Sequence, residues 1–319
     1  MAGRFAPSPT GDLHVGNLRT ALLAWLAARS TGRDFIVRME DLDRVTSSID
    51  HERRQLADLA AIGLDWDGAV VRQSDRFERY RAEIDRLRAA GHVYECFCTR
   101  REIRQEIEAA VAAPHAHLPD GAYPGTCRDL TRADRAERVA SGRLPALRLR
   151  TDGQTIAIDD RVAGRYAGAV DDVVLARADG VPAYNLAVVV DDIAQGVTQV
   201  VRGDDLLSST PRQVLLYDLL GAPPPEYWHV PLVLGADGRR LAKRHGAVTL
   251  VELREAGVAV GSVVEALLRS SGLLGRHDPG DLHALAARFT ADAIRRSATP
   301  FEELGLSDPA ASGRDPVSD

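Results

Sequence analysis

Arg-Phe-Ala-Pro-Ser-Pro-Thr-Gly-Asp-Leu-His-Val-Gly-Asn occupies residues 4–17 and decides the fold. Its beginning reads as the end of a strand, its middle as a Pro/Gly turn, and its end as a helix that starts near Gly16. A helix N-terminus offers unpaired N–H groups and a partial positive charge, which together favour a phosphate. Gly11 and Gly16 let the backbone approach a ligand closely, and His14 adds a donor. The stretch therefore predicts a phosphate site after the first strand.

A basic stretch, Arg-Leu-Ala-Lys-Arg, occupies residues 240–244. It follows an expected strand at 229–234 and a turn at 236–238, so it reads as a loop. Lys243 in such a loop can follow negative charge that develops on a leaving pyrophosphate. Basic loops are also common on protein surfaces, so this reading depends on its combination with residues 4–17.

The composition is typical of a globular protein of two or three modules. The chain has 319 residues, of which 45% are apolar. The net charge of −6 does not indicate a basic nucleic-acid-binding face. No apolar run reaches about 18 residues, so no membrane partner is expected. Three cysteines without a secretory signal favour a reducing compartment, and we expect a cytoplasmic protein.

Apolar periodicity predicts strand, helix and strand over the first 39 residues, with the helix at 18–28 and the second strand at 35–39. That order begins a parallel α/β sheet. A run at 182–191 reads as a buried strand, and 198–202 as the next one. Further helices are expected at 47–63, 76–90, 213–220, 249–256 and 260–270, and short strands at 146–150, 155–158 and 172–177.

All three cysteines lie within a segment of 32 residues, from Cys96 to Cys127. Cys96 and Cys98 share one face of an extended strand. Cys127 follows a Pro-Gly turn that can fold it back toward them. Thiolates suit zinc. Among residues whose chemistry suits a fourth ligand, His115 and His117 lie in the same segment, and the spacing alone leaves that ligand open.

Five ordered motifs carry a resemblance to the catalytic domain of class I glutamyl-tRNA synthetases. His14-Val15-Gly16-Asn17 stands at the HIGH signature, and residues 240–244 stand at the KMSKS signature. The other three motifs are Arg-Met-Glu-Asp-Leu-Asp at 38–43, Tyr-Asn-Leu-Ala at 184–187 and Val-Arg-Gly-Asp-Asp at 201–205. The resemblance runs from residue 3 to about 275. It implies an α/β fold: a Rossmann-type parallel sheet with an inserted acceptor-type subdomain and C-terminal helices.

The resemblance also implies an enzyme that activates L-glutamate with ATP, and with Mg²⁺, to form glutamyl-adenylate. It places His14, Asn17 and Lys243 in catalysis. ATP would contact His14, Gly16, Asn17, Lys243 and Arg244. Glutamate would contact Arg4, Phe5, Ala6, Pro7, Ser8, Glu40, Tyr184 and Arg202. The second motif departs from its usual pattern, because Arg240 replaces a lysine and Ala242 replaces a serine.

A subgroup, the glutamyl-queuosine tRNA(Asp) synthetases, is similar in two further features. Its zinc site resembles the Cys-x-Cys and Tyr-x-x-x-Cys pattern, which implies one structural zinc held by Cys96, Cys98, Tyr123 and Cys127. We also expect no helical anticodon-binding region after the catalytic core. The resemblance then implies tRNA-independent activation, and transfer of glutamate to queuosine at the wobble position of tRNA(Asp).

Three alternatives remain at this stage. The chain could be a truncated synthetase that charges the 3′ end of tRNA(Glu), or a small-molecule ligase. The loss of a hydroxyl at Ala242 motivates a third, a non-catalytic module that binds glutamate or tRNA. We expect five segments: the first half of the catalytic domain (1–91), the inserted subdomain with the zinc site (92–180), the second half (181–245), a helical C-terminal region (246–305) and a disordered tail (306–319).

Overall fold

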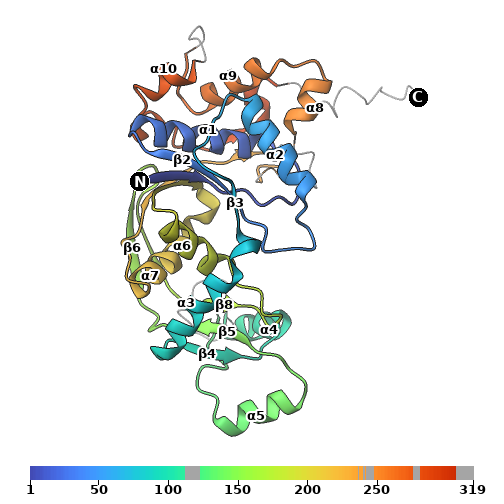
Figure 1. Ribbon diagram of the computed structural model, residues 1–319, viewed down its shortest axis with the longest axis vertical. Coiled ribbons are helices and arrows are strands. Elements are labelled where there is room, and N and C mark those ends of the chain that lie inside the picture. Colours follow the sequence, from blue (N-terminus) through green and yellow to red (C-terminus); the bar gives the residue numbers. More distant parts are fainter. Residues whose placement is uncertain (112–122, 236, 240, 242–247, 276–280, 307–319) are drawn as a thin grey trace, which may run out of the picture.

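A computed structural model describes most of the chain (Figure 1). The residues that it describes are 1–111, 123–235, 237–239, 241, 248–275 and 281–306. The expectations for His115, His117, Arg240, Ala242, Lys243, Arg244 and residues 307–319 lie outside them. Within the described part, we find no helix with the length and apolar character needed to span a membrane.

A five-stranded parallel sheet forms the centre of the molecule, in the order β10-β9-β1-β2-β3. The chain places β2 and β3 on one side of β1, and β9 and β10 on the other. The carboxyl ends of β1 and β9 therefore flank the point where the strand order reverses, which is where open α/β sheets bind ligands. The strands are β1 (Ala2–Phe5), β2 (Asp34–Met39), β3 (Val71–Arg72), β9 (Val197–Gly203) and β10 (Glu226–Val230).

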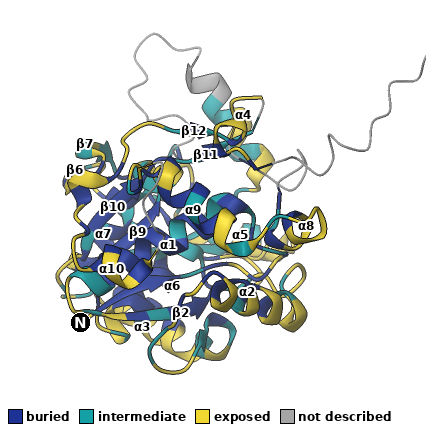
Figure 2. Cartoon of the chain, turned by 90° about the horizontal axis from the view of Figure 1, so that it is seen from above, coloured by how far each residue is buried: buried dark blue, intermediate teal, exposed yellow. Residues whose placement is uncertain are grey.

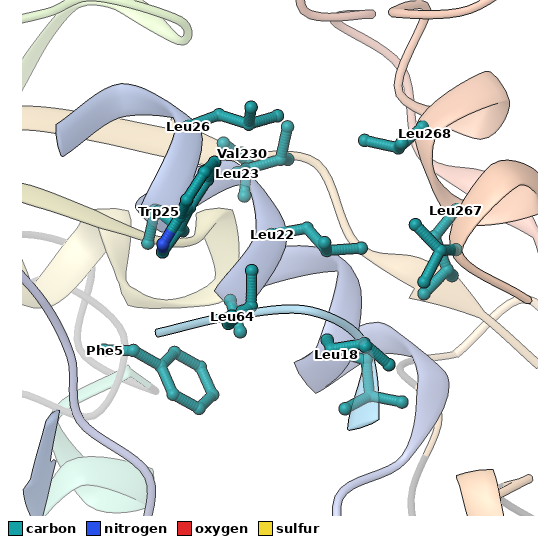
Figure 3. Packing of buried hydrophobic residues seen from close by; sticks show 14 of the residues in the cluster. Phe5, Leu18, Leu22, Leu23, Trp25, Leu26, Leu64, Val230, Leu267 and Leu268 are labelled. Atoms are coloured by element: carbon teal, nitrogen blue, oxygen red, sulfur yellow. The ribbon is translucent and has the colours of Figure 1, made fainter. Parts of the chain in front are cut away.

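Helix α1 (Val15–Ser30) is buried on nearly all sides because it lies between the sheet and the C-terminal helices. Its apolar residues face in every direction, so it lacks the usual polar face of a surface helix. In Figure 3, Leu18 and Leu22 of α1 face Leu267 of α9 (Val260–Ser270). The expected helices at 249–256 and 260–270 are α8 (Leu250–Glu255) and α9, and together with α10 (Leu282–Ala286), which was not predicted, they complete the same core as the first strands.

The other face of the sheet is covered by α6 (Tyr184–Ala194) and α7 (Thr210–Leu219), with α3 (Phe77–Ala89) packed against α6. Viewed from above, α1, α6 and β9 form a buried interior, whereas α2 (Ile49–Ala61) carries many exposed residues (Figure 2). The 3₁₀ turns are η1 (Gln73–Arg76), η2 (Asp204–Ser209), η4 (Ala291–Ala293) and η5 (Phe301–Leu304).

The strand expected at 182–191 is wrong, because this stretch begins helix α6. Its run Leu186–Val190 is buried on every side, and a short continuous apolar run fits a buried helix as well as a buried strand. The strand expected at 229–234 is divided. Strand β10 ends at Val230, and β11 (Val233–Leu234) pairs instead with β12 (Thr299–Pro300).

The inserted segment contains an antiparallel sheet in the order β4-β5-β8, at the lower end of Figure 1. A hairpin from the same segment, β6 (Thr155–Asp160) and β7 (Gly164–Ala169), instead packs against α7, and β6 also contacts β10 of the central sheet. The insertion therefore reaches back to the catalytic core. Its other elements are β4 (Val93–Cys96), α4 (Arg100–Val111), α5 (Arg132–Ala140), β5 (Ala146–Leu149) and β8 (Val174–Ala176).

Candidate active site and metal centre

A cavity of about 590 Å³ opens at the carboxyl ends of β1 and β9. All the residues expected to contact glutamate line it, together with three of those expected to contact ATP. Leu241, the one described residue of the basic stretch at 240–244, also lines the cavity. The expected residues in its lining are Arg4, Phe5, Ala6, Pro7, Ser8, His14, Gly16, Asn17, Glu40, Tyr184 and Arg202.

His14 caps the N-terminus of α1. Its Nδ1 accepts a hydrogen bond of 3.2 Å from the backbone N–H of Asn17, and the Asn17 side chain accepts one of 3.3 Å from the His14 N–H. This reciprocal pair is a capping box. Because Nδ1 is an acceptor, the neutral ring carries its proton on Nε2. A Cβ atom at Gly16 would lie 3.1 Å from the imidazole, so this ring position favours glycine there.

Gln55 holds the turn between β1 and α1, a role that was not predicted from the sequence. Its side-chain amide donates hydrogen bonds to the carbonyl oxygens of Ser8 (3.1 Å) and Gly11 (2.6 Å). The side chain belongs to α2 and is almost fully buried. A buried polar residue with two backbone partners fixes a loop that has no regular structure of its own.

Arg202 is buried in the cavity wall near the end of β9, and its hydrogen-bond partners are neutral. Its Nε donates to His229 Nε2 (3.0 Å), and its two terminal nitrogens donate to Gln213 Oε1 and Thr210 Oγ1 (2.8 Å each). Within the described part of the chain, we find no carboxylate in an ion pair with this guanidinium. The charge is therefore positioned without being neutralised, as a site for a substrate carboxylate requires.

Beneath the cavity, acidic and basic side chains form a buried cluster. Arg38 lies 2.7 Å from Asp192 and 3.4 Å from Glu40, and Arg4 lies 3.7 Å from Asp192. Burial raises the pKa of Glu40, although Arg38 and Arg4 act in the opposite direction. A substrate ammonium beside Glu40 would offset the cost of keeping this carboxylate ionised. Asp192 was not predicted as a site residue. The sequence predicted a strand that ends at residue 191, whereas Asp192 lies inside helix α6.

The three cysteines and Tyr123 converge at the end of β4. Cys98 Sγ lies 3.4 Å from Cys127 Sγ, and the Tyr123 hydroxyl lies 3.3 Å from Cys96 Sγ and 3.6 Å from Cys98 Sγ. All three sulfurs lie within 4.8 Å of one another. Hydrogen bonds from Cys127 and Cys98 lower the pKa of Cys96 despite its burial, and burial raises the pKa of Tyr123.

This donor set fits a tetrahedral metal ion. Zinc–sulfur bonds of about 2.3 Å in a tetrahedron place the sulfurs about 3.8 Å apart, close to the separations above. Backbone groups support the donors, because the N–H of Phe97 points at Cys127 Sγ (3.4 Å). The guanidinium of Arg148 lies 3.7 Å from the centre of the Tyr123 ring, which favours electron density on the phenol.

Comparisons with known proteins place these features in one family. The family described as class I tRNA synthetases (E and Q), catalytic domain, matches residues 1–288. A glutamyl-Q tRNA(Asp) synthetase from Nocardia farcinica is 60% identical over 309 residues, which cover 97% of this chain and 96% of the relative. The protein of the same name from Symbiobacterium thermophilum is 50% identical and covers 88% of this chain and 89% of the relative.

Glutamate–tRNA ligases are more distant and longer. The one from Oleidesulfovibrio alaskensis is 42% identical over 302 residues, and this chain spans 63% of its length. Among solved structures, a glutamate tRNA ligase from Elizabethkingia meningosepticum, in complex with its amino acid, superposes with a TM-score of 0.80 at 25% identity. The match covers 95% of this chain and 68% of that one.

Proposed function

Because the chain belongs to the class I synthetases for glutamate and glutamine, and within them to the glutamyl-Q tRNA(Asp) synthetases, we propose that it activates L-glutamate with ATP and transfers it to queuosine in tRNA(Asp). The observation that carries the first step is the cavity at the strand ends. It combines an arginine held by neutral partners, a buried carboxylate and a capped helix N-terminus. These groups complement a side-chain carboxylate, an ammonium and a phosphate.

Activation needs positioning and charge stabilisation. An α-carboxylate oxygen of glutamate would attack the α-phosphorus of ATP, the bond to the bridging oxygen would break, and pyrophosphate would leave. Mg²⁺ bound to the phosphates would neutralise part of their charge. Arg202 would hold the side-chain carboxylate, with Arg4 as the second cation, and Glu40 would hold the ammonium. Phe5, Ala6, Pro7, Ser8 and Tyr184 would form the remaining wall.

The helix N-terminus at His14, Gly16 and Asn17 would receive the phosphates of ATP. Lys243 and Arg244 would stabilise the leaving pyrophosphate. Lys243 is the only lysine among the 40 basic residues of the chain. An ammonium is a compact point charge on a flexible stem, and a guanidinium does not replace it in geometry. The Lys243 position is thus chemically distinct from every other basic position in the chain.

Transfer would use a hydroxyl on the cyclopentene ring of queuosine. This oxygen attacks the carbonyl carbon of glutamyl-adenylate, its proton is lost, and AMP leaves, so the product is an ester at the wobble position of the anticodon. The identity to proteins named glutamyl-Q tRNA(Asp) synthetase, 60% against 42% for a glutamate–tRNA ligase, supports this acceptor over the 3′ end of tRNA(Glu).

We also propose that Cys96, Cys98, Tyr123 and Cys127 hold one structural zinc ion. The metal would cross-link the end of β4 to the turn at residues 123–127. Bound zinc would keep the thiols and the phenol deprotonated, and its binding would contribute directly to the stability of the insertion.

Two assays test the proposed function. Exchange of pyrophosphate into ATP that depends on glutamate, and proceeds without tRNA, would support activation. Exchange that appears only with tRNA(Glu) would favour a glutamate–tRNA ligase. No exchange in either condition would favour a binding module.

Labelled glutamate should then be transferred to queuosine-containing tRNA(Asp) and not to the same tRNA without queuosine. The label should survive enzymatic trimming of the 3′ end. Label on tRNA(Glu) that trimming removes would contradict the proposed acceptor.

A further inference from the structure

Arg202 uses only some of its N–H groups in hydrogen bonds with the protein. A guanidinium carries five N–H groups. Three of them donate to His229, Gln213 and Thr210, one from each nitrogen. In the described residues, the other two, one on each terminal nitrogen, have no protein partner. A carboxylate takes two parallel N–H groups, so the three protein acceptors decide where that pair points.

His229 can accept from Arg202 in only one protonation state. Its Nδ1 lies 2.6 Å from Asp160 Oδ2, and its Nε2 lies 3.0 Å from both Arg202 Nε and Thr210 Oγ1. An arginine nitrogen can only donate. His229 Nε2 must therefore present its lone pair, so the ring proton is on Nδ1 and points at Asp160. Burial lowers the pKa of His229 and, with the charge of Arg202, outweighs the hydrogen bond to Asp160, so the ring is neutral.

The hydrogen-bond partners of Asp160 favour its ionised form. Both side chains of the Asp160–His229 pair are fully buried. Although burial opposes ionisation, hydrogen bonds from His229 and from the backbone N–H groups of Ala163 and Val162 hold the pKa of Asp160 below its usual range. Its Oδ1 accepts from the backbone N–H groups of Val162 (2.9 Å) and Ala163 (2.8 Å). The backbone N–H of His229 lies 3.1 Å from both carboxylate oxygens, and Oδ2 also faces the imidazole.

Asp160 ends strand β6 of the inserted hairpin, His229 lies on β10, and Arg202 lies on β9. The hairpin is attached at this point by a second contact, in which the Arg161 backbone N–H donates to the Tyr227 carbonyl (3.0 Å). The inserted segment thus supplies the carboxylate of Asp160, which is connected to Arg202 in the cavity wall by the imidazole of His229.

We propose that Asp160 and His229 are positioning residues for glutamate: Asp160 fixes the Nδ1–H tautomer of His229, and the imidazole then orients Arg202 as a neutral acceptor that leaves its charge for the substrate. The inference rests on the proposed function, since it assigns Arg202 to the side-chain carboxylate. A carboxylate in direct contact with Arg202 would hold the guanidinium equally well but would compete with glutamate for its charge.

Asp160→Asn separates this role from simple packing. The backbone N–H groups of Val162 and Ala163 keep the amide oxygen at the Oδ1 position, so the amide NH₂ faces His229 Nδ1. The imidazole must then move its proton to Nε2, where it faces the Arg202 Nε–H and the oxygen of Thr210, which already accepts a hydrogen bond from Arg202. Two donors in contact displace the guanidinium, so the KM for glutamate should rise about tenfold, the value of one lost hydrogen bond. The KM for ATP and kcat should change less than about threefold, as loss of uniform binding predicts.

A double-mutant cycle gives the decisive test. In His229→Gln, the side-chain amide oxygen can accept a hydrogen bond from Arg202 and, unlike imidazole, does not depend on a particular tautomer to do so. His229→Leu offers no acceptor. We expect His229→Leu to raise the KM for glutamate at least as much as Asp160→Asn, and His229→Gln to restore most of the loss. Asp160→Asn should then have little further effect on this KM in the His229→Gln background. Asp159→Asn, an exposed change on the same strand, is the matched control.

Glutamate-dependent pyrophosphate exchange by each folded variant supplies the values. The inference would be overturned if Asp160→Asn left the KM for glutamate unchanged. It would also be overturned if Asp160→Asn had the same effect in the His229→Gln background as in the wild type. In both cases, exchange by the wild-type protein would still support the proposed function. Equal rises in the KM for ATP and glutamate would indicate a structural role only, and would also overturn it. Absence of exchange by the wild-type protein would instead remove the proposed function, and this inference with it.

Discussion

The backbone N–H of Cys127 donates a hydrogen bond of 2.9 Å to the phenolic oxygen of Tyr123. This contact closes the turn between the two residues and directs both donor atoms toward the sulfurs of Cys96 and Cys98. Because the N–H donates to the oxygen, it also favours the tyrosinate that a metal ion would need. The turn therefore positions the phenol of Tyr123 as the proposed fourth zinc ligand, an oxygen donor that is uncommon in zinc sites.

Tyr123→Phe should weaken zinc binding more than tenfold, because it removes one of four ligands while the ring still packs against Arg148. We expect about one zinc per chain in the wild-type protein by elemental analysis, and faster loss of zinc from the variant to a coloured chelator. Cys98→Ser should lose the metal and destabilise the insertion. The control is a double variant in which His115 and His117 are both changed to alanine. If this variant loses zinc and Tyr123→Phe does not, the fourth zinc ligand is a histidine and not Tyr123.

Gln213→Glu should raise the KM for glutamate about 100-fold, since a carboxylate on Arg202 would neutralise the charge that the substrate needs. The amide of Asn185, which now accepts from Gln213 Nε2 (3.1 Å), can rotate to donate to the new carboxylate. Gln213→Leu, which removes the acceptor without adding charge, should have a smaller effect in the same exchange assay. Equal KM values for the two variants would show that the charge of Arg202 is not used.

Lys243→Ala should lower kcat for pyrophosphate exchange about 100-fold, the usual effect of removing one group that stabilises transition-state charge. The melting temperature should not change. Because Lys243 is the only lysine, an amine-reactive reagent should modify this residue and the N-terminus alone. ATP with Mg²⁺ should protect Lys243 while the N-terminus serves as the internal control. Full activity of Lys243→Ala, or modification that ATP does not slow, would remove Lys243 from its assigned role.

Asp58→Asn should stabilise the protein above pH 6. Burial, together with the charge of Asp12, raises the pKa of Asp58 to about 6 from an ordinary value of 3.8, and its Oδ2 has no hydrogen-bond partner. The folded state therefore binds the proton more tightly, and ionisation costs stability as the pH rises between these two values. We expect a gain of about 1 to 2 kcal/mol at pH 7.5, which disappears below pH 4.

Urea unfolding of wild type and Asp58→Asn at pH 4, 6 and 7.5 measures this difference. Asp50→Asn, an exposed change on the same helix, is the matched control and should show no such pH dependence. Equal stability of wild type and Asp58→Asn at pH 7.5 would contradict the assigned burial cost.

The sequence by itself determined the parts of the protein that depend on local patterns. Residues 4–17 predicted a strand, a turn and a helix start, and the structure has β1, the turn and α1 there. The ordered motifs assigned Arg4, Glu40, Tyr184 and Arg202 to one substrate, and these four residues line one cavity. The spacing of the cysteines predicted a cluster, and their three sulfur atoms lie within 4.8 Å of one another. Each of these features follows from residues close in the chain or from a motif whose order is characteristic of the family.

Only the tertiary structure decided which secondary structure Leu186–Val190 adopts and how Arg202 is held. The apolar run fits a buried helix or a buried strand, and its packing between the sheet, α3 and α7 selects the helix. Asp160 and His229 are 69 residues apart, and His229 and Arg202 are 27 apart. No periodicity connects them. They come together because the β6–β7 hairpin packs onto the edge of the central sheet, and buried polar groups then form hydrogen bonds with the partners that the fold places beside them.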